Sequence, residues 1–408
     1  MDFLNINQHG FRQYRSCVTQ LFKFVHTIAK SLDAGIQTDV IYLDMAKAFD
    51  KVPHEKLLYK LEMVGIRGQL LAWFRSYLTN RRHRTVIEGY ASDWRYVPSG
   101  VPQGSIIGPL LFLTFINDTT VNISADTNIP LYADDAKCFR ELLSFDDHDA
   151  LQKDLYSIED WSDLRGMSFN ASKCKHLNIS KMKKPTNSSH QPGNNIIAKT
   201  QCDEDLGVLV DSKLSSHDHI INKVSTAKKV LRLIRSCGSW VIADVIKKLY
   251  VHIVRPHLDY ASQVWSPHQT YLSDIVEAVQ RRATKLMVGN KISYKERLNK
   301  IVLMSLSSGR IYLDLIFSFK CLQSYYDLDI SNYLQFYNSE HEPYNLRNTE
   351  LAFKTNYART ELFRSSFFPR VARLWNNLPI SIRKRESLSL FKKDLRLYCF
   401  AIDSSDLI

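Results

Sequence analysis

Two adjacent carboxylates, Asp134 and Asp135, lie between short runs of apolar, strand-forming residues in the stretch Asn128–Phe139. Apolar runs around a short polar segment are typical of a β-hairpin, so both side chains are expected at or beside its tip. Like charges side by side repel unless something neutralises them, and a divalent cation does so. A solvated acidic turn is the commoner meaning of an isolated Asp-Asp pair. The pair marks a metal site only if a distant residue joins it.

Such a residue is available in Asp44, which ends the apolar run Val40–Leu43. This run predicts a buried strand, and a carboxylate at its end faces a cleft or a partner because an unpaired charge in a core is costly. A sheet with this strand beside the hairpin would bring three carboxylates together. Three carboxylates can hold two divalent ions about 3.5–4 Å apart, as phosphoryl transfer requires. Oxygen ligands without a nearby His or Cys favour magnesium over zinc.

The rest of the chain shows a mixture of helical and strand-like patterns. Helices are expected over residues 18–30, 57–78 with a break at 65–68, 106–116 and 151–164, and strands over residues 85–87, 94–97, 174–179, 196–199 and 206–210. The strands at 196–199 and 206–210 are expected to pair with each other. From residue 214 to about 326 the pattern is helical, and beyond 339 it is less regular.

Charge and cysteine content narrow the classes of function. The 408 residues suffice for two or three domains, and a net charge of +12 suits a polyanionic partner. Seven scattered cysteines without a C-x-x-C pair indicate reduced thiols instead of disulfides or a zinc site. Without a signal peptide or a run of about twenty apolar residues, the sequence predicts an intracellular protein of the nucleus and cytoplasm with no membrane partner.

The sequence leaves the role of two basic segments undecided. The tetrad at 81–84 leads into a predicted hairpin and is either a solvated loop or a nucleic-acid contact. Lys228, Lys229 and Arg232 lie on a predicted helix, where they are either a solvated face or a nucleic-acid surface. The overall charge is compatible with both readings.

Several motifs, in order, resemble the reverse transcriptases of LINE-type, non-LTR retrotransposons, above all the jockey-like group. The matching segments are Gln8–Arg12, Tyr42–Asp50, Ser99–Phe112, Tyr132–Asp135, the trio Gly166, Asn170 and Lys173, and Leu206–Val208. The likeness extends over roughly residues 5–400. Beside these relatives, the abrupt basic start predicts an N-terminal truncation, with neither the upstream fingers segment nor an endonuclease domain. The sequence near the C-terminus has no cluster of Cys and His residues that would indicate a zinc knuckle.

The resemblance implies an α+β fold: a right-hand polymerase palm, with an antiparallel sheet and helices on one face, followed by a mostly helical thumb. It implies a fingers remnant or fingers–palm connection at 1–37, the palm at 38–212, the thumb at 213–330 and a basic C-terminal region at 331–408. It also implies RNA-directed DNA polymerase activity, a nucleotidyl transfer to a primer 3′-hydroxyl. The alternative is a catalytically inactive, truncated relic that only binds nucleic acid.

The resemblance further assigns the metal-binding residues. Asp44 and Asp134 would bind two Mg²⁺ ions, with Mn²⁺ as a substitute, and the carbonyl of Met45 would assist them. Asp135 would lie nearby in a more structural role. Lys173 would protonate the departing pyrophosphate, or it is a solvated surface lysine.

Substrate contacts are implied in the same way. Phe49 would stack on the incoming sugar and exclude a 2′-hydroxyl, or it packs in the core. Gln103 and Gly104 would lie along the template base and the nascent pair. The implied partners are an RNA template, a DNA primer or target DNA, and deoxynucleoside triphosphates; protein partners are not indicated. The turn Leu206-Gly207 would grip the primer, and the basic helix with Lys228, Lys229 and Arg232 would follow the duplex backbone.

Overall fold

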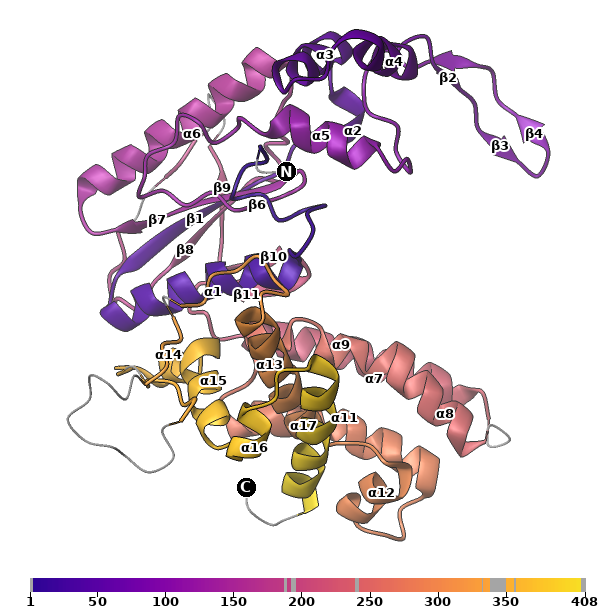
Figure 1. Cartoon of the computed structure of the whole chain (residues 1–408), viewed down its shortest axis with the longest axis vertical. Helices are drawn as coiled ribbons and strands as arrows, with labels where there is room; N and C mark the ends of the chain where they lie inside the picture. The colour runs from indigo at the N-terminus through magenta and orange to yellow at the C-terminus, as the bar shows by residue number, and fades with distance from the viewer. Residues whose placement is uncertain are drawn as a thin grey trace. The chain divides into compact units, whose positions relative to one another are not determined.

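The computed structural model describes residues 3–186, 189–191, 196–238, 242–331, 333–337, 350–355 and 357–404. The chain divides into two compact units (Figure 1): residues 1–20 with 35–203, and residues 21–34 with 204–408. Helix α1 (Cys17–Ala34) contributes to both. The four predicted domain ranges stay predictions.

A five-stranded sheet forms the centre of the first unit. Its strands, in spatial order, are β6 (Leu131–Tyr132), β7 (Asp135–Leu142), β1 (Gln37–Leu43), β8 (Lys175–Ile179) and β9 (Ala198–Thr200). The central strand β1 is antiparallel to both neighbours, and its last residue, Leu43, lies opposite Ala136 of β7. This register sets the end of β1 beside the start of β7, where the paired carboxylates lie.

Helix α6 (Phe145–Arg165) covers one face of this sheet (Figure 1). Leu151, Leu155 and Ile158 of α6 pack on Ile41 and Cys138. The first turn of α6 has a capping box, in which the Asp147 carboxylate accepts a hydrogen bond from the backbone N–H of Ser144. The apolar stripe and the cap together explain why this segment forms a long helix on the sheet.

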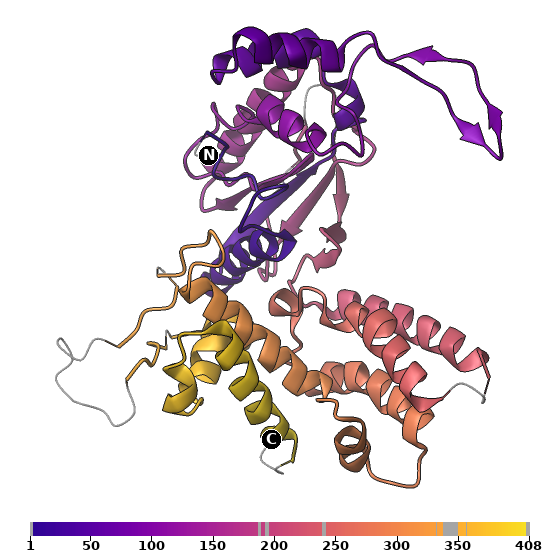
Figure 2. The same ribbon diagram turned by 45° about the vertical axis from the view of Figure 1, so that its right-hand side comes forward.

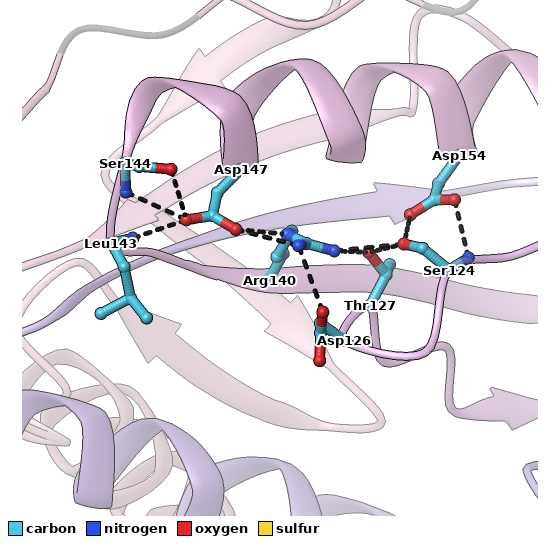
Figure 3. Close-up of polar contacts among 8 residues, drawn as sticks. All are labelled: Ser124, Asp126, Thr127, Arg140, Leu143, Ser144, Asp147 and Asp154. Carbon is cyan, nitrogen blue, oxygen red and sulfur yellow. Dashed lines mark hydrogen bonds and ion pairs between the residues drawn. The ribbon is translucent and has the colours of Figure 1, made fainter.

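Arg140 of β7 ties the helix, the strand and a loop together (Figure 3). Its guanidinium lies 2.9 Å from the Asp147 carboxylate of α6 and donates hydrogen bonds to Ser124 and Thr127. Ser124 in turn donates to Asp154, two turns further along α6. The network fixes the outer end of the strand whose other end carries the Asp-Asp pair.

The other helices of this unit surround a second core. They are α2 (Ala48–Lys51), α3 (His54–Met63), α4 (Gly68–Leu78) and α5 (Gly108–Ile116). Phe112 and Phe115 of α5 lie at its centre with Leu57, Met45 and Ala133. The residues around the Asp-Asp turn and the end of β1 therefore rest on a packed helical layer.

An exposed hairpin extends from α4 (Figure 2). It contains the strand pairs β2 (Arg82–His83) with β5 (Arg95–Tyr96) and β3 (Val86–Ile87) with β4 (Tyr90–Ala91). The guanidinium of Arg82 lies over the ring of Tyr96 at 5.2 Å, and that of Arg84 over Trp94 at 4.7 Å. Every residue of these strands is exposed, so the hairpin presents cations and aromatic rings to solvent.

The second unit is mostly helical. Its elements beyond α1 are β10 (Cys202–Asp205), β11 (Val208–Asp211), α7 (His217–Ser236), α8 (Ala243–Leu249), the π-helix η1 (Tyr250–Val254), α9 (Pro256–Asp259), α10 (Ser262–Trp265), α11 (Thr270–Val288), α12 (Tyr294–Ile301), α13 (Leu306–Leu322), α14 (Glu361–Arg364), α15 (Phe367–Asn376), α16 (Ile380–Arg383) and α17 (Leu388–Ser404). No single helix in the described ranges is long and apolar enough to cross a membrane, although the bent pair α12–α13 meets that test by length and composition.

The predicted α+β fold is confirmed, with three local differences. First, β9 pairs in parallel with β8 instead of with residues 206–210, because those residues turn back on β10. Second, α5 begins at Gly108, so Ile106 is exposed instead of buried in a helix. Third, residues 361–404 of the C-terminal region form mostly helices, α14 to α17. In α17, Phe391, Leu395 and Cys399 recur every four residues on the buried face.

Candidate active site

Asp44 lies directly after β1, and neighbouring backbone bonds hold it there. Its carbonyl oxygen accepts a hydrogen bond from the N–H of Asn170 at 2.8 Å, and the N–H of Ala46 donates to Ser168 at 2.9 Å. These two bonds flank an antiparallel bridge between Met45 and Phe169 that does not use the carbonyl of Met45. The Asp44 carboxylate thus projects from a backbone pinned on both sides.

Asp134 occupies the tight turn between β6 and β7. Tyr132 and Asp135 pair across the turn, which leaves Ala133 and Asp134 as its two central residues. Ala133 has φ 53°, a backbone conformation that a residue with a side chain adopts only when its surroundings enforce it. Asp134 is half-buried, whereas Asp135 is exposed on the first residue of β7.

The segment Asn7–Gly10 enforces this turn. The side-chain oxygen of Gln8 accepts hydrogen bonds from the N–H groups of Ala133 at 2.9 Å and of Gly10 at 2.7 Å. The backbone of this segment also pairs with Leu131 on both sides of Gln8. A Cβ on Gly10 would lie 2.4 Å from the backbone nitrogen of Ala133, so only glycine fits. The sequence showed Gln8–Arg12 as a matching segment but gave no sign that it braces the carboxylates.

Electrostatics indicate that Asp44 and Asp134 share one site. Burial and then the negative charge of Asp44 raise the pKa of Asp134, while the cation of Lys173 opposes them. The Lys173 ammonium lies 3.4 Å from an Asp44 carboxylate oxygen and is 64% exposed. Two carboxylates this close to each other form an oxygen-rich site suited to a hard divalent cation.

The surroundings of Phe49 are compatible with both predicted alternatives, packing in the core and stacking on the incoming sugar. Its half-buried ring stacks on Phe112 with centroids 4.3 Å apart, and it meets Phe11 edge-on at 6.4 Å. The contact with Phe112 is the core packing of one alternative, and the remaining exposure leaves part of the ring accessible. Its role toward a sugar stays a prediction.

Gln103 and Gly104 lie on an exposed loop beside α2. The amide of Gln103 donates a hydrogen bond to the Asp50 carboxylate at 2.7 Å, one residue beyond Phe49. Ser99 donates to the carbonyl oxygen of Asp50 at 2.8 Å. The loop is therefore anchored to the same short helix that carries Phe49, while Gly104 faces open space.

The other predicted residues belong to the second unit. Leu206 and Gly207, with φ 44° and 84°, form the two-residue turn between β10 and β11. The Tyr260 hydroxyl donates to the carbonyl oxygen of Leu206 at 2.8 Å and fixes the turn. On α7, Lys229 and Arg232 are exposed and Lys228 is half-buried. Primer and duplex contacts by these residues stay predictions.

The structure thus brings Asp44, Asp134 and Lys173 together, with Met45 adjacent in the chain. Gln103, Gly104 and Phe49 form a neighbouring group held by Asp50. The specific roles of all these residues stay predictions. Among the described residues, Gln8 and Gly10 brace the turn that holds Asp134, and the motifs alone did not indicate these contacts.

The sequence of this chain is similar to those of known proteins. The chain is 29% identical over 289 residues to the RNA-directed DNA polymerase from mobile element jockey of Drosophila funebris, which covers 66% of the chain and 30% of that relative. It is 25% identical over 294 residues to the probable RNA-directed DNA polymerase from transposon X-element of Drosophila melanogaster, covering 69% and 32%. The chain therefore spans only about 30% of the length of these relatives.

Among solved structures, telomerase from Candida albicans in complex with a fragment of telomeric RNA aligns with 70% of this chain and 52% of its own, with a TM-score of 0.39 and 12% identity. The predicted resemblance to jockey-like polymerases is confirmed as a similarity. Residues 2–209, half of the chain, match the family described as reverse transcriptase (RNA-dependent DNA polymerase), and this range contains Asp44, Asp134 and Lys173. The chain belongs to the reverse transcriptase family.

Proposed function

We propose that this chain is an RNA-directed DNA polymerase that adds deoxynucleotides to a primer 3′-hydroxyl on an RNA template. The observation that carries this proposal is the convergence of Asp44 and Asp134 from two strands, with Lys173 3.4 Å from Asp44. A module that only binds nucleic acid does not require two mutually repelling carboxylates in one site. The implied partners are an RNA template, a DNA primer or target DNA, and deoxynucleoside triphosphates.

Members of this family use divalent metal ions. For this chain the proposed ions are two Mg²⁺, which Mn²⁺ can replace, because the donors are carboxylate oxygens of Asp44 and Asp134 and the carbonyl of Met45. When bound, such ions activate the primer 3′-hydroxyl and neutralise the triphosphate. Asp44 and Asp134 supply the negative charge, and the turn braced by Gln8 keeps Asp134 in place.

Lys173 provides a mobile proton donor at this site. Its ammonium carries three protons, and its exposure allows it to reach a phosphate oxygen. We expect it to donate a proton to the leaving pyrophosphate. Replacement by Met should lower the rate of incorporation by about 10²-fold. Lys173→Arg should keep the positive charge but lose the proton transfer, because a guanidinium does not give up its proton.

The test of polymerisation is extension of a labelled DNA primer on an RNA template with Mg²⁺. The variant Asp134→Ala should lower incorporation by at least about 100-fold, while the control Asp160→Ala, which removes an exposed carboxylate of α6, should keep the rate. Template binding is measured in parallel by fluorescence anisotropy. Binding without incorporation in the unaltered chain would contradict the proposal.

Phe49 is proposed as the residue that excludes ribonucleotides. The variant Phe49→Ala should raise the ratio of ribonucleotide to deoxynucleotide incorporation by at least about 10-fold. Loss of the stacking on Phe112 also lowers stability, but the ratio does not depend on how much enzyme is folded. An active variant with an unchanged ratio would leave Phe49 with core packing alone.

A further inference from the structure

A second polar cluster lies in the first unit, near the start of strand β1, whereas Asp44 follows the end of that strand. It contains Asp39 of β1, His176 of β8 and His190 of the β8–β9 connection. One ligand atom from each residue lies within 4.8 Å of the others, and all three side chains are buried. Asp39 precedes Asp44 by five residues, about 17 Å along an extended strand, so the cluster is separate from the candidate active site.

The Asp39 carboxylate is oriented toward the two imidazoles. One of its oxygens, Oδ1, accepts hydrogen bonds from the amides of Asn178 at 2.8 Å and of Gln37 at 3.2 Å. The other, Oδ2, lies 3.1 Å from Nε2 of His176 and 3.1 Å from Nε2 of His190. Side-chain amides that hold one carboxylate oxygen while the other faces histidine nitrogens are typical of an outer ligand shell around a metal.

Hydrogen bonding within the protein does not account for this arrangement. Nε2 of His190 has hydrogen-bond geometry toward Asp39, but Nε2 of His176 does not, although it is equally close. Among the described residues, that nitrogen has no hydrogen-bond partner, and His176 is only 1% exposed. A buried polar atom without a partner costs about 1–3 kcal/mol. The 3.1 Å between Nε2 of His176 and Oδ2 of Asp39 lies off the hydrogen-bond axis. It is slightly shorter than the distance between two ligands on one tetrahedral zinc ion, about 3.3–3.4 Å for bonds of about 2.0–2.1 Å.

The chain on both sides of His190 is tied to the same unit. Thr186 exchanges two hydrogen bonds with the side chain of Gln37, at 2.8 and 3.1 Å. Gln191 exchanges two with the side chain of Gln152 of α6, at 2.6 and 3.1 Å. The position of His190 opposite Asp39 is therefore fixed by neighbours as well as by its own contact.

We propose that Asp39, His176 and His190 bind one zinc ion that fastens the β8–β9 connection to the sheet. Two imidazole nitrogens and one carboxylate oxygen suit Zn²⁺ far better than Mg²⁺, which prefers oxygen ligands only. Water fills the fourth tetrahedral position. The ion joins β1 and β8 to the connection that returns the chain as the parallel strand β9, and it is independent of the polymerase proposal.

The test measures zinc and cobalt binding by the full chain after removal of metals with a chelator. We expect one tightly bound equivalent by mass spectrometry of the metal, and a zinc-dependent rise in Tm. The variant His190→Gln should lose that equivalent, with an affinity lowered by at least about 100-fold, and should lose the rise in Tm. The control His83→Gln, an exposed histidine of the hairpin, and Asp134→Ala should both retain it.

Cobalt bound in place of zinc to the unaltered chain reports the ligand atoms by its spectrum, so this test does not depend on whether a variant folds. A tetrahedral cobalt spectrum without thiolate charge-transfer absorption supports ligation by nitrogen and oxygen, since the chain's seven cysteines are the main competing ligands. Thiolate absorption, an octahedral spectrum, or equal zinc content in the unaltered chain and His190→Gln would overturn the proposal.

Discussion

At the residue scale, the position of Asp134 depends on a residue without a side chain. A Cβ at Gly10 would lie 2.4 Å from the backbone nitrogen of Ala133, and neither backbone can move without breaking the bonds around Gln8. We expect Gly10→Ala to displace the turn and lower incorporation by about 100-fold, because a misplacement of about 1 Å is enough for such a loss. Template affinity should stay unchanged in the same assay.

The control is Gly65→Ala, at a glycine with φ 95° whose added Cβ meets nothing within 4 Å. It has the strain of a left-handed backbone without a collision, so it should cost about 1 kcal/mol of stability and keep the rate of incorporation. Equal rates in Gly10→Ala and the unaltered chain would show that the brace is not needed for catalysis.

The repulsion between Asp44 and Asp134 predicts a conflict between stability and activity. The folded pKa of Asp134 is raised by burial and by Asp44, so above that pKa its charge destabilises the fold, and the cost disappears as the pH falls through it. Without divalent ions at pH 8, Asp134→Asn should therefore unfold at a higher urea concentration than the unaltered chain, while incorporation is lost. Added Mg²⁺ should stabilise the unaltered chain more than the variant; a variant less stable than the unaltered chain in the chelator would contradict this.

At the element scale, Arg140 joins β7 to α6, and its loss should loosen the sheet face on which the active site rests (Figure 3). The side chain is only 10% exposed, and Asp147 keeps backbone donors at Leu143 and Ser144 after its removal. We expect Arg140→Met to lower the free energy of unfolding by about 2–3 kcal/mol, as measured by the urea midpoint.

A matched control is Arg75→Met, which breaks an ion pair with Glu55 whose side chains are 52% and 70% exposed. An exposed pair contributes little, so its loss should change stability by less than about 0.5 kcal/mol. Similar changes for the two variants would mean that the Arg140 network does not hold α6.

The elements also show what the sequence could and could not predict. The strand ending at Asp44, the helix α6 and the hairpin tip followed from apolar spacing. The start of β1 did not, because Gln37, Thr38 and Asp39 are polar yet buried, and only partners such as Asn178 and His190 make that burial tolerable. The pairing of β9 with β8 was missed because three-residue strands carry no pattern that identifies their partner.

At the scale of the whole molecule, the net charge of +12 predicts that binding of nucleic acid weakens with salt. Helix α7 is a candidate for much of this effect, because Val224 and Leu231 are buried while Lys229 and Arg232 are exposed, with Lys228 at the border. Its cations lie opposite an apolar face, and a basic face of this kind suits a polyanion.

Replacing Lys228, Lys229 and Arg232 by Ala should lower the slope of log K against log salt by about 2–3, since each lost phosphate contact removes about 0.7–0.9. The matched comparison replaces Lys392, Lys393 and Arg396 of α17, an equal loss of charge. If the C-terminal region only packs on its own unit through the buried face of α17, that set should leave the slope nearly unchanged. Equal decreases would instead show that affinity follows net charge over the whole surface, and the assignment of the duplex backbone to α7 would then be wrong.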